Sequence, residues 1–156
     1  MAQDRGGGGV RSAPPVRVKW SPILLLDCNF LGHQARHSSS ASLSHKGIPT
    51  GVMFGFLSRI LTLGRTLGTN RMVFCWDSQE SIRRQRHSPE YKLARITTRK
   101  AEPPEDAVKT ADAFWQFETL RNWVLPIMGF MNVRQQEGLE ADDLIAHLAG
   151  DDLVQI

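Results

Sequence analysis

Three short apolar runs, each followed by a longer amphipathic segment, limit this chain to a small set of folds. The runs are ILLLD at residues 23–27, MVFCWD at 72–77 and FMNVRQQ at 130–136. The first two are almost continuously apolar, which is typical of strands buried on both faces of a sheet. Strands that alternate with helices in this way predict an α/β fold with a mostly parallel sheet flanked by helices.

The segments that separate the runs have helical periodicity. One helix is expected to begin with Thr50 at its N-cap position. A second follows the prolines of AEPPED and ends near Pro126, and a third begins with EADDLIAHLA. The side chains expected to face inward are Met53, Phe56, Leu57, Ile60, Leu61 and Leu67 in the first helix, and Val108, Ala111, Trp115, Leu120 and Val124 in the second. The polar stretch 37–49 is expected to be a loop.

Length and composition are those of an ordinary globular domain. A chain of 156 residues with 41% hydrophobic and 22% charged side chains can bury a sizeable core. Residues 1–19 hold a four-glycine run, paired prolines and scattered charges, and they predict a disordered leader before one domain at 20–156. The formal charge of +3 permits a polyanionic partner but does not require one.

The apolar runs are too short for a membrane span of ~20 residues or for a signal-peptide core. The expectation is therefore a cytoplasmic protein without a membrane partner. Cys28 and Cys75 are expected to be small buried side chains in a reducing compartment, with a disulfide between them disfavoured.

Acidic side chains stand at the carboxyl ends of the predicted strands. Asp27 and Asp77 end the first two strands, and Glu140, Asp142 and Asp143 open the helix after the third. Each acid alone has an ordinary explanation in a turn or at a helix start. Parallel sheets, however, bind their ligands beyond the carboxyl ends of their strands. Acids gathered at that edge predict an Mg²⁺ or Mn²⁺ site, and two such ions would serve hydrolysis of a phosphodiester bond.

A basic segment, 81–100, follows the second strand. Its seven cations are Arg83, Arg84, Arg86, Lys92, Arg95, Arg99 and Lys100, against the one acid Glu90. A solvated surface helix is the plain alternative. Because the segment starts beside the acidic edge, its cations are expected to hold phosphates there. Tyr91 offers a stacking surface for a base, and the helix start at Thr50 and Gly51 offers backbone N–H groups to a phosphate.

With these residues in place, the chain resembles the N-terminal, PIN-like part of the 5′-to-3′ exonuclease and flap endonuclease family, which includes the 5′-nuclease domain of bacterial DNA polymerase I and the phage 5′-nucleases. The matching stretches are LLLDCNFLGHQARHS, LSHKGIPTGVMFGFL, VFCWDSQESIRRQRHSPEYKLAR and LPIMGFMNVRQQEGLEADDLIAHLA. They cover residues 23–149 in the family's order and spacing. The resemblance implies a metal-dependent nuclease that acts on DNA with a free 5′ end or a flap.

The resemblance also implies roles for single residues. The metal ligands would be Asp27, Asp77, Glu140, Asp142 and Asp143, of which Asp27, Asp77 and Asp142 are also named as catalytic together with Lys92. The motif YKxxR falls on Tyr91, Lys92 and Arg95, and the family's lysine at that place stabilises charge in the transition state. Arg83 and Arg86 match a basic region around the path of the 5′ end. His33, Arg36 and His37 fall in the loop that follows the first strand, and a zinc site from His33, His37 and His45 is disfavoured for want of a fourth ligand.

The C-terminal residues depart from the family's pattern. After Ala149 the chain runs at once into GDDLVQI, where the family has more helix, a further strand and an Asp-x-Asp pair. Asp152 is expected to be the second acid of that pair, and a truncated or internally deleted product is expected. Two other functions stay open: a nucleic-acid-binding fragment that does no chemistry, and a PIN-type ribonuclease.

Overall fold

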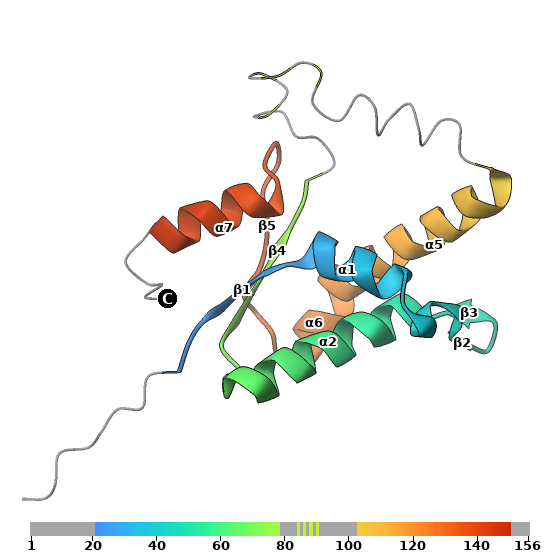
Figure 1. Ribbon diagram of the computed structural model, residues 1–156, viewed down its shortest axis with the longest axis horizontal. Coiled ribbons are helices and arrows are strands. Elements are labelled where there is room, and N and C mark those ends of the chain that lie inside the picture. Colours follow the sequence, from blue (N-terminus) through green and yellow to red (C-terminus); the bar gives the residue numbers. More distant parts are fainter. Residues whose placement is uncertain are drawn as a thin grey trace, which may run out of the picture.

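The structure is a computed structural model that describes residues 21–78 and 103–150 and the single positions 84, 86, 88 and 90. Three strands, β1 (Leu24–Asp27), β4 (Met72–Trp76) and β5 (Val133–Gln135), form a parallel sheet in the order β1-β4-β5. Phe74 is in register with Leu26 on one side and Val133 on the other. The predicted α/β fold is confirmed (Figure 1). The predicted leader, residues 1–19, lies outside the described residues.

The connection from β1 to β4 begins with a helix that the sequence analysis missed. Helix α1 (Cys28–Arg36) starts directly after β1, so the placement of His33 and Arg36 in a loop was wrong. Asp27 explains the helix start, because its Oδ1 accepts the N–H of Phe30 at 2.8 Å and so caps the first turn.

The polar stretch after α1 is more regular than expected. It contains a 3-10 turn, η1 (Ser39–Ser42), and a small antiparallel hairpin of β2 (Ser44–His45) and β3 (Ile48–Pro49). Lys46 and Gly47, with φ of 51° and 79°, make the tight turn between the two strands. Helix α2 (Gly51–Leu67) follows, and Gly68 ends it in the left-handed conformation, with φ of 64°.

The connection from β4 to β5 ends in one long helical rod. It consists of α5 (Pro104–Thr119), the wider π turn η2 (Leu120–Val124) and α6 (Leu125–Ile127). Pro126 explains the change of helical register, because a proline ring clashes with the carbonyl four residues before it in a regular α-helix. Helix α7 (Ala141–Gly150) follows β5. None of the described helices is long and apolar enough to cross a membrane.

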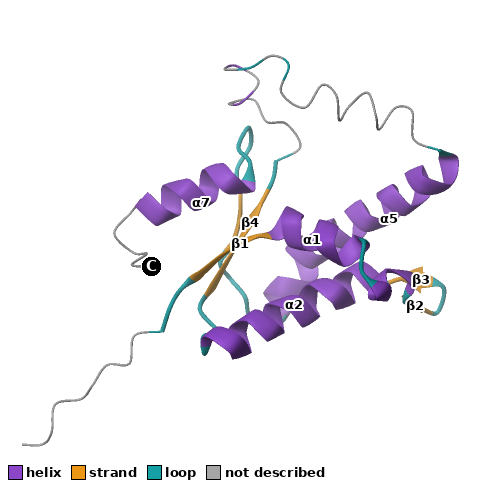
Figure 2. Ribbon diagram, viewed as in Figure 1, coloured by secondary structure: helices purple, strands orange, loops and turns teal. Residues whose placement is uncertain are grey.

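The two faces of the sheet are covered unequally (Figure 2). Strand β4 sends alternate side chains to opposite faces. Met72, Phe74 and Trp76 join the main core with α1, α2 and α5, whereas Cys75 packs with Ala141 and Leu144 in a small second cluster under α7.

The inward face predicted for the second helix was right near its C-terminal end, where Leu120 is buried and Val124 packs against the core, and wrong for Val108, Ala111 and Trp115. Val108 and Trp115 are 61% and 49% exposed, whereas Ala113 and Phe117 are buried. The rod turns Phe117 toward α1, where a Cβ on Gly32 would lie 2.4 Å from the phenylalanine ring. A close approach of helices at a glycine therefore sets which face is inward, and the apolar spacing does not reveal it.

The inward face of α2 was predicted better. Phe56 and Ile60 are fully buried, and Met53 and Leu57 pack against the core. The two expectations nearer the helix C-terminus were wrong, because Leu61 and Leu67 are 52% and 47% exposed.

Candidate metal and nucleic-acid site

Three elements bring acidic residues to the carboxyl end of the sheet. Asp27 ends β1, Asp77 directly follows the adjacent strand β4, and Glu140 directly precedes α7. The Asp77 carboxylate also fixes α7, since its Oδ1 accepts the N–H of Ala141 at 2.8 Å. One side chain thus ties the end of a strand to the start of the helix that carries Asp142 and Asp143.

Two amides that the sequence analysis did not single out hold Asp77 in position. The Oδ1 of Asn29 accepts the backbone N–H of Asp77 at 2.9 Å, and the Nε2 of Gln135 donates to the Asp77 carbonyl oxygen at 2.6 Å. Asn29 lies on α1 and Gln135 ends β5. Both stand where a strand meets its following segment, which is the signal that could have found them.

The pKa of the Asp27 carboxyl reflects both its burial and its acidic neighbours. Burial raises its pKa, and the negative charges of Asp77 and Asp142 raise it further, while the N–H of Phe30 lowers it. Residues more than a hundred positions apart in the sequence are therefore close enough to affect one another's charge.

The acids that open α7 are paired with a cation. Arg84 lies 3.0 Å from Glu140 Oε2 through one terminal nitrogen, and its other two nitrogens lie 3.6 Å from Asp142 Oδ2 and from Asp143 Oδ2. Asp143 Oδ2 also accepts the backbone N–H of Glu140 at 3.1 Å, in the manner of a capping box. Sequence analysis counted Arg84 only as one cation of the basic segment.

The donor chemistry of this edge fits a hard divalent cation, because every acid offers carboxylate oxygens. The arrangement of the side chains is not that of a formed metal centre. Over the described parts of the chain, no three His, Cys, Asp or Glu side chains are close enough to hold an ion. That applies equally to a zinc site from His33, His37 and His45. The ligand roles of the acids therefore stay a prediction.

At the start of α2, where a phosphate was predicted to bind, two backbone N–H groups already have an acceptor within the protein. The buried side chain of Gln116 accepts the N–H groups of Val52 and Met53 at 3.0 and 3.1 Å. Gly51 is packed so tightly that a Cβ would lie 2.1 Å from the Ser40 carbonyl oxygen. Thr50 occupies the N-cap position without a side-chain capping bond. Phosphate binding at Thr50 and Gly51 stays a prediction.

Most of the predicted basic site falls outside the described residues. The residues that fall outside are Arg83, Tyr91, Lys92 and Arg95. Asp152, near the C-terminus, also lies outside the described residues. Arg86 is described, and it is exposed.

The two cysteines are free and buried, as expected. Burial raises the pKa of both thiols, that of Cys75 to about 11. They act as apolar packing groups beside the acidic edge, and Cys28 donates weakly to the Leu26 carbonyl oxygen.

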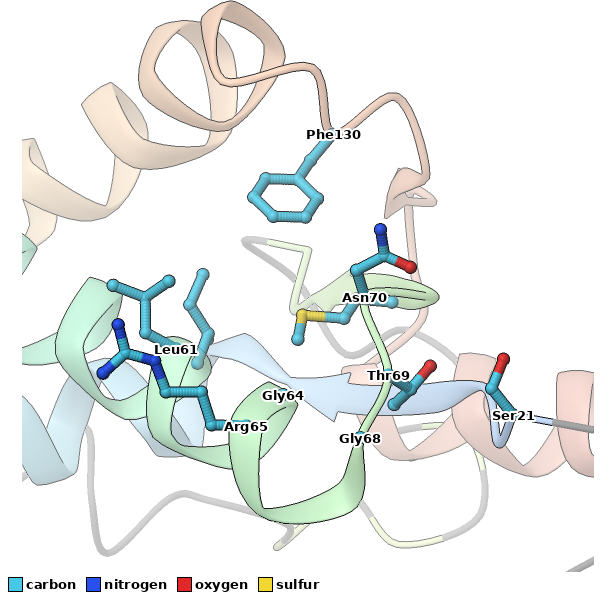
Figure 3. A pocket seen from close by; sticks show the side chains of 10 residues that line it. Ser21, Leu61, Gly64, Arg65, Gly68, Thr69, Asn70 and Phe130 are labelled. Atoms are coloured by element: carbon cyan, nitrogen blue, oxygen red, sulfur yellow. The ribbon is translucent and has the colours of Figure 1, made fainter. Parts of the chain in front are cut away.

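A cavity of about 360 Å³ lies at the opposite end of the sheet (Figure 3). Its lining residues are Ser21, Ile60, Leu61, Gly64, Arg65, Gly68, Thr69, Asn70, Met72 and Phe130. The described lining is mainly apolar and contains no carboxylate, so it offers none of the groups that phosphodiester hydrolysis needs.

Comparison with known proteins connects the chain to a nuclease family. The family model of the 5′-3′ exonuclease N-terminal, resolvase-like domain matches residues 22–154. DNA polymerase I of Mycobacterium bovis and that of Mycobacterium tuberculosis are each 30% identical over 141 residues, which is 88% of this chain and 14% of theirs.

A solved structure, that of T5 5′-exonuclease with bound divalent metal ions (zinc), has the same fold. It superposes with a TM-score of 0.66 at 22% identity, and the match covers 81% of this chain and 43% of the exonuclease. The chain thus spans less than half of the length of these relatives. The family model covers most of the chain, and the fold agrees with it: the chain belongs to the family of the 5′-3′ exonuclease N-terminal, resolvase-like domain.

Proposed function

We propose that this chain is the metal-binding part of a 5′-nuclease that hydrolyses phosphodiester bonds of DNA near a free 5′ end or a flap. The observation that carries the proposal is the gathering of Asp27, Asp77 and Asp142 from three elements at the carboxyl end of the sheet, where burial raises the pKa of Asp27 and the charges of the other two raise it further. Family membership supports the reaction class, and the bound ions of T5 5′-exonuclease support a metal requirement.

The residues proposed to hold Mg²⁺ or Mn²⁺ are Asp27, Asp77, Glu140, Asp142 and Asp143, with Asp152 as a further candidate. A bound ion would supply charge stabilisation on the phosphoryl oxygens. The chain's own residues do the rest: Asp77 and Asn29 fix the strand end, and the capping bond from Ala141 fixes α7 against it. Preorganisation of this kind is what makes electrostatic stabilisation effective.

The basic segment is proposed to hold the substrate. Lys92 would stabilise the negative charge that develops on the scissile phosphate. Tyr91 would stack on a base, and Arg83, Arg86 and Arg95 would pair with phosphates along the strand. The helix start at Thr50 and Gly51 is a secondary phosphate contact in this proposal.

The test is cleavage of an end-labelled 5′-flap DNA by the purified chain with Mg²⁺, Mn²⁺ or EDTA. Asp142→Asn should abolish cleavage, because it removes one ligand charge while keeping the side-chain shape. Asp106→Asn, the same change on α5 in a residue that pairs with Lys109, is the matched control and should cleave normally. Equal cleavage by the Asp142 variant, or cleavage in EDTA, would contradict the proposal.

One observation favours a second function, a nucleic-acid-binding domain without chemistry. The guanidinium of Arg84 already pairs with the acids at the start of α7, and the described side chains do not converge on one ion. That function predicts flap binding without cleavage by a folded chain under every metal condition. An RNA strand of the same sequence, run beside the DNA, distinguishes a ribonuclease.

A further inference from the structure

Arg84 contacts the acids that open α7 in an unusual way. Its guanidinium lies within 3.6 Å of all three, using a different nitrogen for each. The other described ion pairs, Lys109–Asp106 and Arg121–Glu118, join neighbours three residues apart on one helix. Arg84 instead belongs to the segment after β4 and reaches across to the start of α7.

The burial of two of these three acids gives Arg84 an energetic role. The Glu140 and Asp143 side chains are only 6% and 14% exposed. A buried carboxylate without a cation is costly, since desolvation disfavours its charge. Arginine keeps its charge at all ordinary pH, and its planar fork pairs with several oxygens at once. Arg84 therefore stabilises the acidic cluster in the absence of any ion.

The same oxygens are the ones proposed to bind a divalent cation. An ion placed on Glu140 Oε2 or Asp143 Oδ2 would lie a few ångströms from the guanidinium, and like charges at that separation repel strongly in a partly buried site. The two cations therefore compete for these oxygens, and binding of one weakens binding of the other.

We propose that Arg84 is a built-in competitor for the metal: it holds the Glu140, Asp142 and Asp143 cluster when no ion is bound and withdraws when a divalent cation binds. The inference rests on the proposed function, which assigns these acids as ligands. It also accounts for the acids being gathered at one edge without converging on one point. Displacement of Arg84 costs part of the metal's binding energy, and linkage requires each cation to weaken the other by the same factor.

A purely structural Arg84 makes the opposite prediction. If its role were only to keep the acids in place, its removal would loosen the cluster and weaken metal binding. If it competes with the metal, its removal strengthens metal binding while lowering stability in EDTA. The sign of the change in metal affinity separates the two roles.

The experiment is titration of the full chain with Mn²⁺ by calorimetry, without nucleic acid. Arg84→Gln should bind Mn²⁺ about tenfold tighter than the unmodified chain, given the strength of a charged hydrogen bond. Arg59→Gln removes one positive charge from the exposed side of α2 and is the matched control; it should leave the affinity nearly unchanged. Thermal unfolding with EDTA and with Mn²⁺ is measured on the same samples.

Arg84→Lys keeps a positive charge but cannot bridge three carboxylates. It replaces the glutamine variant in the experiment if that variant folds poorly without metal. It should show a larger Mn²⁺-induced rise in Tm than the unmodified chain. Mn²⁺ binding that is equal or weaker in the Arg84 variants overturns this inference and leaves the proposed function standing. If no folded chain, variant or not, binds Mn²⁺, the proposed metal-dependent function falls, and this inference falls with it.

Discussion

The two faces of the sheet are covered by helices that are held in place by different interactions. On one face α1, α2 and α5 bury a continuous core that includes Phe56, Trp76 and Phe117. On the other, α7 buries only Ala141 and Leu144 against Cys75, with a few half-buried neighbours. The N-terminus of this helix also makes polar contacts, with Asp77 and through its acids with Arg84.

That difference relates stability to function. The well-packed face gives a rigid platform for β1 and β4, the strands that deliver Asp27 and Asp77. The thinly packed face carries the acids whose charges would have to rearrange around an ion. A helix start fixed by charges can respond to a new charge, whereas a close-packed core cannot.

The largest effect is expected in the main core. Phe56 is fully buried and stacks on Trp76 with ring centroids 5.8 Å apart. Phe56→Ala should lower the free energy of unfolding by about 3–5 kcal/mol, a large part of a domain's stability. Urea denaturation followed by circular dichroism measures it. A loss of stability no larger than that expected for Leu144→Ala, the variant under α7 described next, would mean that the two faces do not differ as described.

Leu144→Ala tests the other face. The expected cost is about 2–3 kcal/mol, because the leucine is 9% exposed and sits in a small cluster. The loss should be local: amide hydrogen exchange should accelerate in α7 while α2 keeps its protection. Equal acceleration in both helices would show that the faces unfold as one unit.

Gln116→Met tests a polar contact inside the large core. The change keeps the volume but leaves the N–H groups of Val52 and Met53 without their acceptor, at a cost of about 1–3 kcal/mol. Exchange of those two amides should accelerate most. The exposed neighbour Trp115, changed to Met, is the control and should have little effect on stability. Unchanged stability in the Gln116 variant would contradict the capping role.

Asp27→Asn should give the smallest effect, and it should be stabilising. The pKa of Asp27 is raised above its ordinary 3.8, mainly by burial, so its ionised form destabilises the fold above that range. Asparagine is neutral and still accepts the N–H of Phe30. At neutral pH without metal the variant's Tm should be higher, by about 1–3 °C. The difference should shrink as the pH falls and vanish only well below 3.8, where the aspartic acid is protonated in both the folded and the unfolded chain. A lower Tm at neutral pH would contradict this account of the acidic edge.

The sequence predicted the sheet well because its signals are local. Continuous apolar runs ending in Asp27 and Asp77 marked the two strands, and the acids before α7 marked the edge. It failed where contacts between distant segments decide the outcome. Phe117 packs at Gly32 and Trp115 faces outward, and the apolar spacing of α5 fits either face, so the sequence alone does not choose between them.

The candidate site divides in the same way. The acidic residues were visible as a pattern at strand ends and a helix start. Asn29 and Gln135, which bond to the Asp77 backbone, were marked only by their place at a strand end, and the pairing of Arg84 with the acids was not marked at all. Their roles depend on which residues meet in space, and a polar residue with one partner in space has no periodic signature.

The most direct test of the acidic edge as a metal site is paramagnetic broadening by Mn²⁺ in the amide spectrum of the full chain. Mn²⁺ at low concentration should broaden the signals of Asp27, Asp77 and Ala141–Asp143 first, leaving those of the β2–β3 hairpin sharp. Broadening centred on His33, His37 and His45, or spread evenly over the chain, would contradict the account.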